Sequence, residues 1–228
     1  QAPSAKAGMQ RFVWDLRYAP PEGFPRSYPI SAIYRNTPTV PQGPAVLPGE
    51  FTIKLSAGGK QITEPLTIKM DPRVTTPSAG IAKMFEVSFG SYEGIRKIRE
   101  AQAEIRSLRA RLQSLKGQAG QGAVADALDE FDKKAAALNP APGGQGQGGF
   151  GGAGGGEQTF ARLAAEFNVI MAIAESADAE PTAQAIAAYN ESRKSLGDLL
   201  ARWNEMKNKG LNDLNEKLRR ANMSQVKL

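Results

Sequence analysis

Residues 98–115, Ile98-Arg-Glu-Ala-Gln-Ala-Glu-Ile-Arg-Ser-Leu-Arg-Ala-Arg-Leu-Gln-Ser-Leu115, carry the clearest pattern in the sequence. Apolar residues recur every seven positions in two sets, which are Ile98, Ile105 and Leu112, and Ala101, Leu108 and Leu115. This spacing aligns both sets along one stripe of an α-helix. It predicts a helix from about Pro77 to Lys116, on the order of 55–60 Å long. Such a helix is too long to stand alone, so we expect partner helices along its stripe.

Three further helices are predicted downstream. Gly117, Gly120 and Gly122 are expected to end the first helix. Apolar residues at helical spacing then mark a second helix (Val124, Leu128, Phe131, Ala135, Leu138), a third (Phe160, Leu163, Phe167, Ile170, Ala174) and a fourth that begins at Pro181 (Ile186, Tyr189, Leu196, Leu200, Trp203, Leu214). Short breaks between such helices favour antiparallel neighbours. We therefore predict an up-down bundle over residues 73–228, in which the two longest helices span its length.

A glycine-rich segment interrupts this helical region. Residues 143–156 hold ten of the 24 glycines, so residues 139–157 are predicted to form a flexible loop. The stretch from Gly144 to Gly149 formally matches a phosphate-binding G-x-G-x-x-G pattern. No predicted strand precedes it and no helix begins at it, which favours a linker.

Upstream of the helices, the apolar pattern changes to the period of two that is typical of β-strands. In residues 9–18, Phe12, Trp14, Leu16 and Tyr18 share one face, which predicts a half-buried strand. From Glu50 a hairpin is predicted: alternating apolar residues run to a Gly58-Gly59 turn and return along Ile62, Leu66, Ile68 and Met70. Pro65 in the returning strand predicts an edge position or a bulge.

The segment between these strands is rich in proline. Residues 19–49 contain eight of the 15 prolines, so an extended hydrogen-bonded ladder cannot run through most of it. It is predicted to be a long ordered loop, with room for a short strand at Ile30 to Tyr34.

The predicted fold class is α+β: a partial immunoglobulin-like β-sandwich in residues 1–72, followed by an antiparallel helical bundle with long helices. Three or four strands fall short of the seven or so of such a sandwich. Their apolar face and edges would be left uncovered, so we expect upstream residues of the same polypeptide, or another chain, to complete the domain. The alternative is that the face packs on the helical bundle and forms one α+β unit.

Composition removes many kinds of chemistry. The chain has no cysteine and no histidine, which excludes disulfides, thiol nucleophiles, Ser-His-Asp triads and most zinc sites. The charge of +6 arises from 29 basic and 23 acidic residues and is spread over both regions. Its most basic stretches, Arg96 to Lys116 and Arg202 to Lys227, are interleaved with apolar residues at helical spacing. No catalytic, metal-binding or cofactor-binding residue, no nucleic-acid partner and no membrane span is predicted.

Four features could mark functional sites, but each has a simpler structural interpretation. The acidic group Asp126, Asp129, Glu130 and Asp132 is expected on the exposed side of the second helix, near its N-terminus, where negative charge is favourable. Asn190 and Asn222 match the glycosylation pattern by chance. Asp15 and Arg17 are expected to form ordinary surface ion pairs. Trp14 and Trp203 are expected in the core.

Several motifs resemble a known family. They are Gly8-Met-Gln-Arg-Phe-Val-Trp-Asp-Leu-Arg-Tyr, Gly43-Pro-Ala-Val-Leu-Pro-Gly-Glu-Phe-Thr-Ile-Lys-Leu, Glu64-Pro-Leu-Thr-Ile-Lys-Met-Asp-Pro-Arg, Pro181-Thr-Ala-Gln-Ala and Leu199-Leu-Ala-Arg-Trp-Asn-Glu-Met-Lys. Their order is similar to that in the C-terminal region of bacterial secreted sortilin-like β-propeller proteins, often labelled BNR-repeat or glycosyl-hydrolase-like. The resemblance implies an exported propeller ahead of this segment, an extracellular or periplasmic location, and no catalytic residue in this part.

Three functional hypotheses follow. The first is a non-catalytic accessory segment whose partners are the propeller portion or a companion chain, with self-association through the helical stripes. The second is a glycan-processing hydrolase whose active site lies in the propeller and to which this segment contributes a wall of the cleft, with Asp15, Glu22 or Glu50 as candidate carboxylates. The reaction needs two carboxyls about 5–10 Å apart. The third is a membrane- or nucleic-acid-binding bundle, whose binding would weaken steeply with salt.

Overall fold

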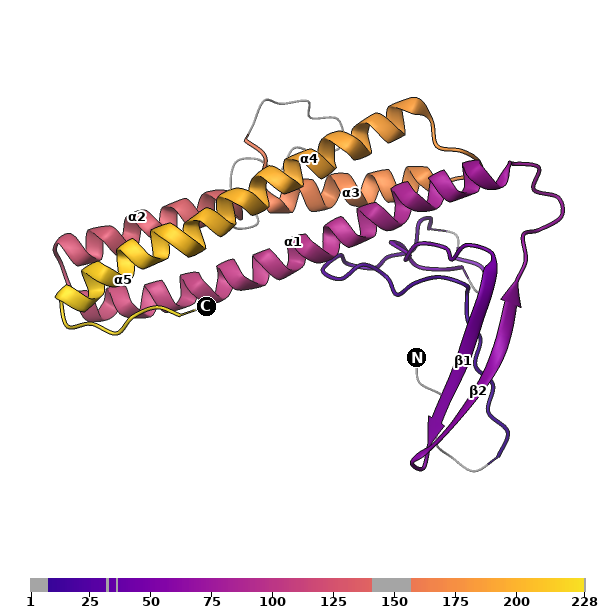
Figure 1. Cartoon of the computed structure of the whole chain (residues 1–228), viewed down its shortest axis with the longest axis horizontal. Helices are drawn as coiled ribbons and strands as arrows, with labels where there is room; N and C mark the ends of the chain where they lie inside the picture. Colours follow the sequence, from indigo (N-terminus) through magenta and orange to yellow (C-terminus); the bar gives the residue numbers. More distant parts are fainter. Residues whose placement is uncertain (1–7, 32, 36, 141–156, 228) are drawn as a thin grey trace.

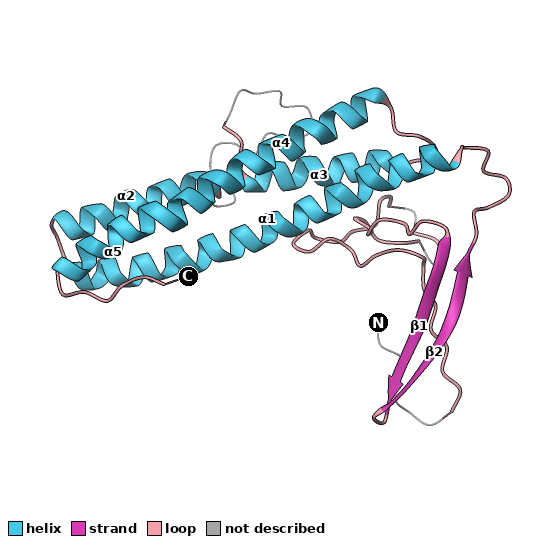
Figure 2. Cartoon of the chain, viewed as in Figure 1, coloured by secondary structure: helices cyan, strands magenta, loops and turns pink. Residues whose placement is uncertain are grey.

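The computed structural model describes residues 8–31, 33–35, 37–140 and 157–227. It is a mixed α+β structure in which a two-stranded antiparallel sheet precedes a helical bundle (Figures 1 and 2). The elements are β1 (Gly49–Ala57), β2 (Lys60–Ile68), α1 (Ser78–Ala119), α2 (Ala123–Leu138), α3 (Phe160–Ala174), α4 (Ala183–Glu205), the π-helical segment η1 (Met206–Gly210) and α5 (Leu211–Arg220). The glycine-rich loop predicted at residues 139–157, including the pattern from Gly144 to Gly149, lies almost entirely outside the described residues.

The bundle has three helical positions in cross-section. Helix α1 runs its whole length, α2 returns along the C-terminal half of α1, and α3 lies along the N-terminal half (Figure 1). The rod formed by α4, η1 and α5 then runs back beside α1, passing first along α3 and then along α2. The predicted antiparallel pairing therefore holds between α1 and α2 and between α3 and α4. However, α3 continues in the direction of α2 instead of reversing it. At ~1.5 Å per residue, neither α2 nor α3 alone is long enough to cover α1, so they share that task end to end.

The predicted stripe of α1 forms the centre of the core. All six heptad residues are buried, and Ile98, Ile105 and Leu108 are completely so. Opposite them lie the apolar residues predicted for the later helices, including Leu128, Phe160, Leu163, Phe167 and Trp203. The stripe is therefore buried within the chain. It is not available for the self-association through helical stripes that we predict from the sequence.

The end of α1 differs from the prediction by one glycine. The helix passes through Gly117 and ends at Ala119. The turn is made by Gly120 and Gly122, whose φ values of 66° and 127° suit glycine. Gly117 has ordinary helical backbone angles, and a lone glycine lowers helix stability without ending the helix.

The π-helical segment η1 keeps the last rod in register with the core. Trp203 and Leu211 are both buried but lie eight residues apart, which in a plain α-helix would turn Leu211 about 80° away from Trp203. A π-bulge inserts one residue into the helix. The eight-residue step then spans close to two turns, so Leu211, Leu214 and Leu218 continue the face that Trp203 begins.

The hairpin is confirmed, with nine paired positions from Gly49–Ile68 to Ala57–Lys60. Gly58 and Gly59, with φ of 55° and 75°, make its turn. The register is continuous through the Thr52–Pro65 pair, so Pro65 marks an edge and no bulge. This sheet is the only one in the described residues, and a full sandwich is not present there.

Two predicted strands are wrong. Residues 9–18 form no strand: Leu16 adopts a φ of 59°, which breaks the alternation, and only Arg17 bridges to Ala45. That bridge rests on two backbone hydrogen bonds, from Tyr18 N to the Pro44 carbonyl and from Val46 N to the Leu16 carbonyl, both 2.9 Å. Residues 30–34, of which residue 32 is not described, likewise hold no strand.

Two glycines of α1 provide a matched test of this packing. A Cβ at Gly94 would lie 2.8 Å from Phe167 Cε2 in the core, whereas a Cβ at Gly117 would meet no atom within 4 Å. We expect Gly94→Ala to lower the free energy of unfolding by about 1–3 kcal/mol through overpacking. Gly117→Ala should raise it by about 0.5–1 kcal/mol through helix propensity. Urea unfolding followed by circular dichroism measures both, and equal effects of the two variants would contradict the α1–α3 contact.

Candidate functional site

The hairpin is amphipathic. Residues directly opposite each other in an antiparallel pair point to the same side. One side therefore carries six large apolar residues, together with Gly49, Ala57, Lys60 and Glu64. We call the six the apolar face: Phe51, Ile53, Leu55, Ile62, Leu66 and Ile68. The other side carries polar residues and Pro65. Near the turn the apolar face is open to solvent, with exposed fractions of 52% for Ile53, 54% for Leu55 and 58% for Ile62.

Only the inner half of this face is covered. Trp14 stacks edge-on against Phe51 with ring centroids 5.8 Å apart, and its indole Nε1 donates to the Arg17 carbonyl at 2.9 Å. Trp14 is thus half-buried, whereas Trp203 is buried as expected. The hairpin points away from the bundle (Figure 1). The outer half of the apolar face therefore does not pack on the helices, contrary to the alternative weighed from the sequence.

A single carboxylate attaches the segment before the hairpin to the bundle. Glu175, which caps the C-terminal end of α3, pairs with Arg17 and accepts from Ala45 N at 2.8 Å and Ser88 Oγ at 2.7 Å. Arg17 also donates to the Gly43 carbonyl at 2.8 Å. We call this group the Glu175 joint. It corrects the expected surface pair, because Arg17 is mostly buried and contacts Asp15 through a backbone N–H at 3.2 Å.

Aromatic stacking reinforces the Glu175 joint. The Tyr18 ring lies 5.0 Å from Phe89 and 6.3 Å from both Phe85 and Tyr92, measured between centroids. All three partners project from the N-terminal half of α1. Gly43 passes so close that a Cβ there would clash with the Tyr18 and Ala19 carbonyls. The chain beside Tyr18 is therefore fixed both by polar contacts and by packing.

A groove of about 670 Å³ lies where residues 21–23 cross α1. Arg99 spans it, donating to the carbonyls of Glu22 at 3.1 Å and Gly23 at 3.0 Å and stacking on Phe24 at 5.0 Å. Burial, with the neighbouring Arg106, lowers the pKa of Arg99 from its ordinary value. Arg96 in the same wall is paired with Glu93 and Glu100. Arg96 and Arg99 are thus engaged with the chain itself, which leaves Arg106 as the further cation in the lining of the groove.

The three carboxylates proposed for hydrolysis have separate local partners. Asp15 accepts from Arg17 N, Glu22 lines the groove of Arg99, and Glu50 accepts from Thr67 Oγ1 at 2.8 Å. Among the described residues, no side-chain hydrogen bond joins any two of them, and the groove of Arg99 is lined by Glu22 but not by Asp15 or Glu50.

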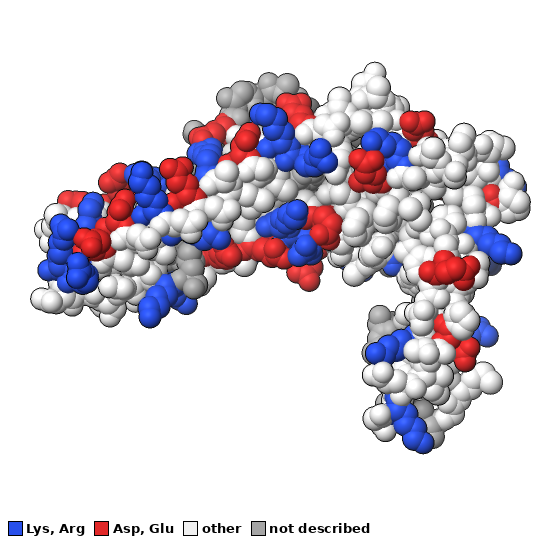
Figure 3. All heavy atoms as spheres, in the orientation of Figure 1, with Lys and Arg blue, Asp and Glu red and all other residues white. Residues whose placement is uncertain are grey.

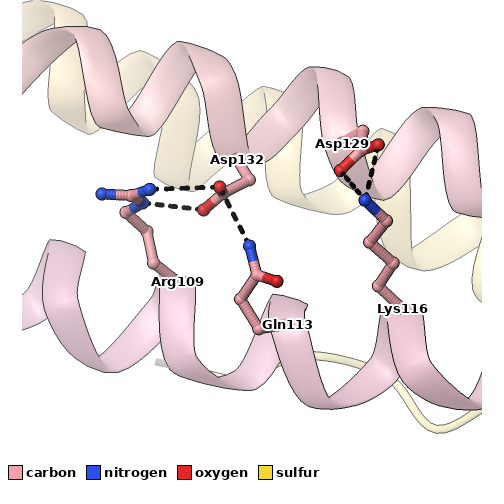
Figure 4. A network of polar contacts seen from close by, with 5 residues as sticks. All are labelled: Arg109, Gln113, Lys116, Asp129 and Asp132. Carbon is pink, nitrogen blue, oxygen red and sulfur yellow. Dashed lines mark hydrogen bonds and ion pairs between the residues drawn. The ribbon is translucent and has the colours of Figure 1, made fainter.

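The acidic group of α2 is solvated only in part: Asp126, in the first turn, is exposed as expected, whereas Asp129 and Asp132 face α1. Asp132 is 9% exposed and accepts from Arg109 at 2.8 Å and Gln113 at 3.3 Å, and Asp129 accepts from Lys116 at 2.7 Å (Figure 4). The bond with Asp132 raises the pKa of Arg109, and together these bonds tie α2 to α1. Glu130 does remain outside, paired with Lys134. The group is a helix contact, and the described residues contain no acidic cluster suited to a metal ion.

A second polar contact ties α1 to the last rod. Glu104 Oε2 accepts from Trp203 Nε1 and from Lys207 Nζ, both at 2.8 Å. The Lys207 bond, aided by that of Trp203, lowers the pKa of Glu104 against a smaller opposing effect of burial. The heptad pattern gives no sign of this contact, because Glu104 lies beside the stripe and its partners are 99 and 103 residues away.

Comparison with known proteins found no matching family model, no matching curated protein and no matching solved structure. Among the helices described here, none combines the length and the apolar character that crossing a membrane requires.

The Glu175 joint makes a local prediction. Glu175→Gln removes the ion pair with Arg17, and we expect faster hydrogen exchange at the Tyr18 and Val46 amides while the amides of α4 keep their protection. Glu86→Gln, which affects an exposed pair with Lys83 on α1, is the matched control and should change neither. Unchanged exchange at both amides in Glu175→Gln would show that the attachment rests on stacking alone.

The Glu104 contact makes a pH prediction. Because the pKa of Glu104 in the folded chain lies below its ordinary value of 4.5, the contact stabilises the fold above that pH and loses its effect as pH falls through the folded pKa. The melting temperature of Glu104→Gln should therefore lie below that of the native chain at pH 7, with the gap closing below pH 4.5. Glu191→Gln, on the exposed surface of α4, serves as control. A gap that is constant with pH would contradict the contribution of the carboxylate charge.

Proposed function

We propose that this chain is a non-catalytic accessory segment that mediates domain packing and assembly, with the hairpin as the docking element and the helical bundle as a rigid arm. The single observation that carries the proposal is the solvent-exposed outer half of the apolar face. Ile53, Leu55 and Ile62 alternate with polar residues, so they form one apolar surface on a solvated hairpin. Exposed apolar strands of this kind invite association with a partner.

The arm is built to hold this face in place. The Glu175 joint and the stacking of Tyr18 attach the preceding segment to α1 and α3, and Trp14 continues the attachment to Phe51. A docking surface on a fixed support loses less freedom on binding than one on a loose hairpin, which favours assembly.

In the finer form of this proposal, the hairpin belongs to an immunoglobulin-like sandwich that other β-structure completes. The resemblance of several motifs to the C-terminal region of bacterial sortilin-like propeller proteins supports a propeller portion of the same polypeptide, or a companion chain, as that partner. The same resemblance supports an extracellular or periplasmic location.

Surface charge favours assembly over the binding of polyanions. Lys and Arg alternate with Asp and Glu along the bundle face shown in Figure 3, and most of the surface near the hairpin carries neither. Many of the cations are paired within the chain, as with Arg96, Arg109 and Lys116. A nucleic-acid surface would instead concentrate unpaired positive charge. For hydrolysis, Asp15, Glu22 and Glu50 make different local contacts, which offers no support for a catalytic pair.

The proposal predicts that the apolar face drives association. We expect the native chain to bind the dye ANS and to associate with rising concentration in sedimentation experiments. Replacing Ile53 and Leu55 together by Thr should reduce both effects and leave the helical content unchanged. The matched control is Gln61→Thr with Thr63→Ser on the polar side, which should behave like the native chain.

Two observations together would contradict the docking role of the hairpin. A native chain that stays monomeric at high concentration, with hairpin amides that exchange as slowly as those of the bundle, would contradict a docking role.

A further inference from the structure

Within the described residues, no strand pairs with the outer edge of β1, which leaves this edge open to an added strand. Because Pro65 has no N–H, the Thr52–Pro65 pair must be a non-hydrogen-bonded pair of the ladder. Pairs alternate along an antiparallel ladder, so the backbone N–H and C=O groups of Glu50, Thr52, Lys54 and Ser56 point outward. Among the described residues, no backbone group bonds to them.

The two edges of the hairpin are unequal. On β2 the outward position opposite Thr52 is Pro65, which offers no donor and whose ring obstructs an incoming strand. On β1 all four outward positions carry an N–H. Strand addition is therefore favoured on β1 and opposed on β2.

The β1 edge is complementary to itself. In an antiparallel pairing of two β1 strands centred on Thr52, Glu50 of each copy lies opposite Lys54 of the other on the polar side. On the apolar side, Phe51 lies opposite Ile53. Opposite charges stabilise directly facing positions and like charges destabilise them. A pairing centred on Lys54 would oppose two lysines and one centred on Glu50 would oppose two glutamates, so charge selects the Thr52 register.

We propose that the partner of the hairpin is a second copy of this chain, paired antiparallel through β1 about Thr52 into a four-stranded sheet of order β2-β1-β1-β2. The two apolar faces then join into one continuous surface. Pro65 lies on both outer edges of this sheet, so growth stops at two copies and gives a closed two-fold dimer instead of a fibre. This inference rests on the proposed assembly role and names the partner of the β1 edge; the joined apolar face, on which Phe51 of each copy lies opposite Ile53 of the other, remains the docking surface of that role.

Crosslinking tests the register. The chain has no cysteine, and Thr52 would face Thr52 of the second copy at a Cα separation of about 5.5 Å, within the range of a disulfide or a short bismaleimide. We expect Thr52→Cys to give a covalent dimer at micromolar concentration. Thr63→Cys is the matched control, because it lies on the same side of the hairpin but on β2, with two strands between the copies. It should remain uncrosslinked.

Charge reversal tests the pairing without a crosslink. Glu50→Lys and Lys54→Glu should each weaken the dimer about tenfold or more in sedimentation experiments, since two attractive pairs become repulsive. Mixing the two variants should restore a heterodimer, because every lysine then faces a glutamate. A restored heterodimer would show that each variant weakens the dimer through charge repulsion. Loss of the Glu50–Thr67 hydrogen bond or misfolding would not be repaired by mixing the two variants.

The outcomes distinguish the two proposals. Equal crosslinking at Thr52 and Thr63, or mixed variants that do not recover, would overturn the dimer. If association then still depends on Ile53 and Leu55, the docking role stands with a different partner. If association is absent altogether, both proposals fail.

Discussion

The burial of one apolar stripe along 42 residues of α1 is the constraint on which the rest of this structure depends. No single helix returns along the whole stripe, and the chain meets the requirement with two different devices. On one side α2 and α3 share the length end to end. On the other side α4 and α5 form one rod whose phase is corrected by η1. Small residues at close contacts, such as Gly90 and Gly94, let Tyr189 and Phe167 approach the α1 backbone.

The position of the hairpin follows from this bundle and not from the sheet itself. Glu175 lies where α3 ends, and Ser88 lies on α1, so the carboxylate that accepts from Arg17 and Ala45 is placed by the packing of two helices. Taking a carboxylate out of water is unfavourable unless several donors satisfy it, and three donors do so here. A segment with almost no regular structure thereby gains a defined orientation.

Sequence reasoning succeeded where a local period decides the structure. The heptads of α1 and the alternation around Gly58-Gly59 gave the bundle and the hairpin because burial repeats along each element. It failed at residues 9–18, where the alternation is equally clear but Leu16 takes a left-handed backbone angle that no pattern reveals. The Glu175 joint was equally out of reach, since Arg17 and Glu175 are 158 residues apart. The charge of Asp132 predicts an exposed position, because the sequence pattern does not indicate that Arg109 pairs with it. This pair makes the burial of Asp132 tolerable.

The same failure at residues 9–18 sharpens the question of what the hairpin needs. A two-stranded hairpin is only marginally stable in water, and the expected third strand does not pair with it. Trp14 and Phe51 secure the inner half, so the outer half, where Ile53, Leu55 and Ile62 are exposed, gains stability from added strands or from a partner on its apolar face. The Glu175 joint fixes the base of the hairpin, and binding of a partner then adds order to the outer half, because the contacts that bind also fix the strands. The two edges of the hairpin therefore limit which strand can supply that stability. Pro65 opposes the addition of a strand to β2, whereas Glu50 and Lys54 favour a strand of complementary charge on β1.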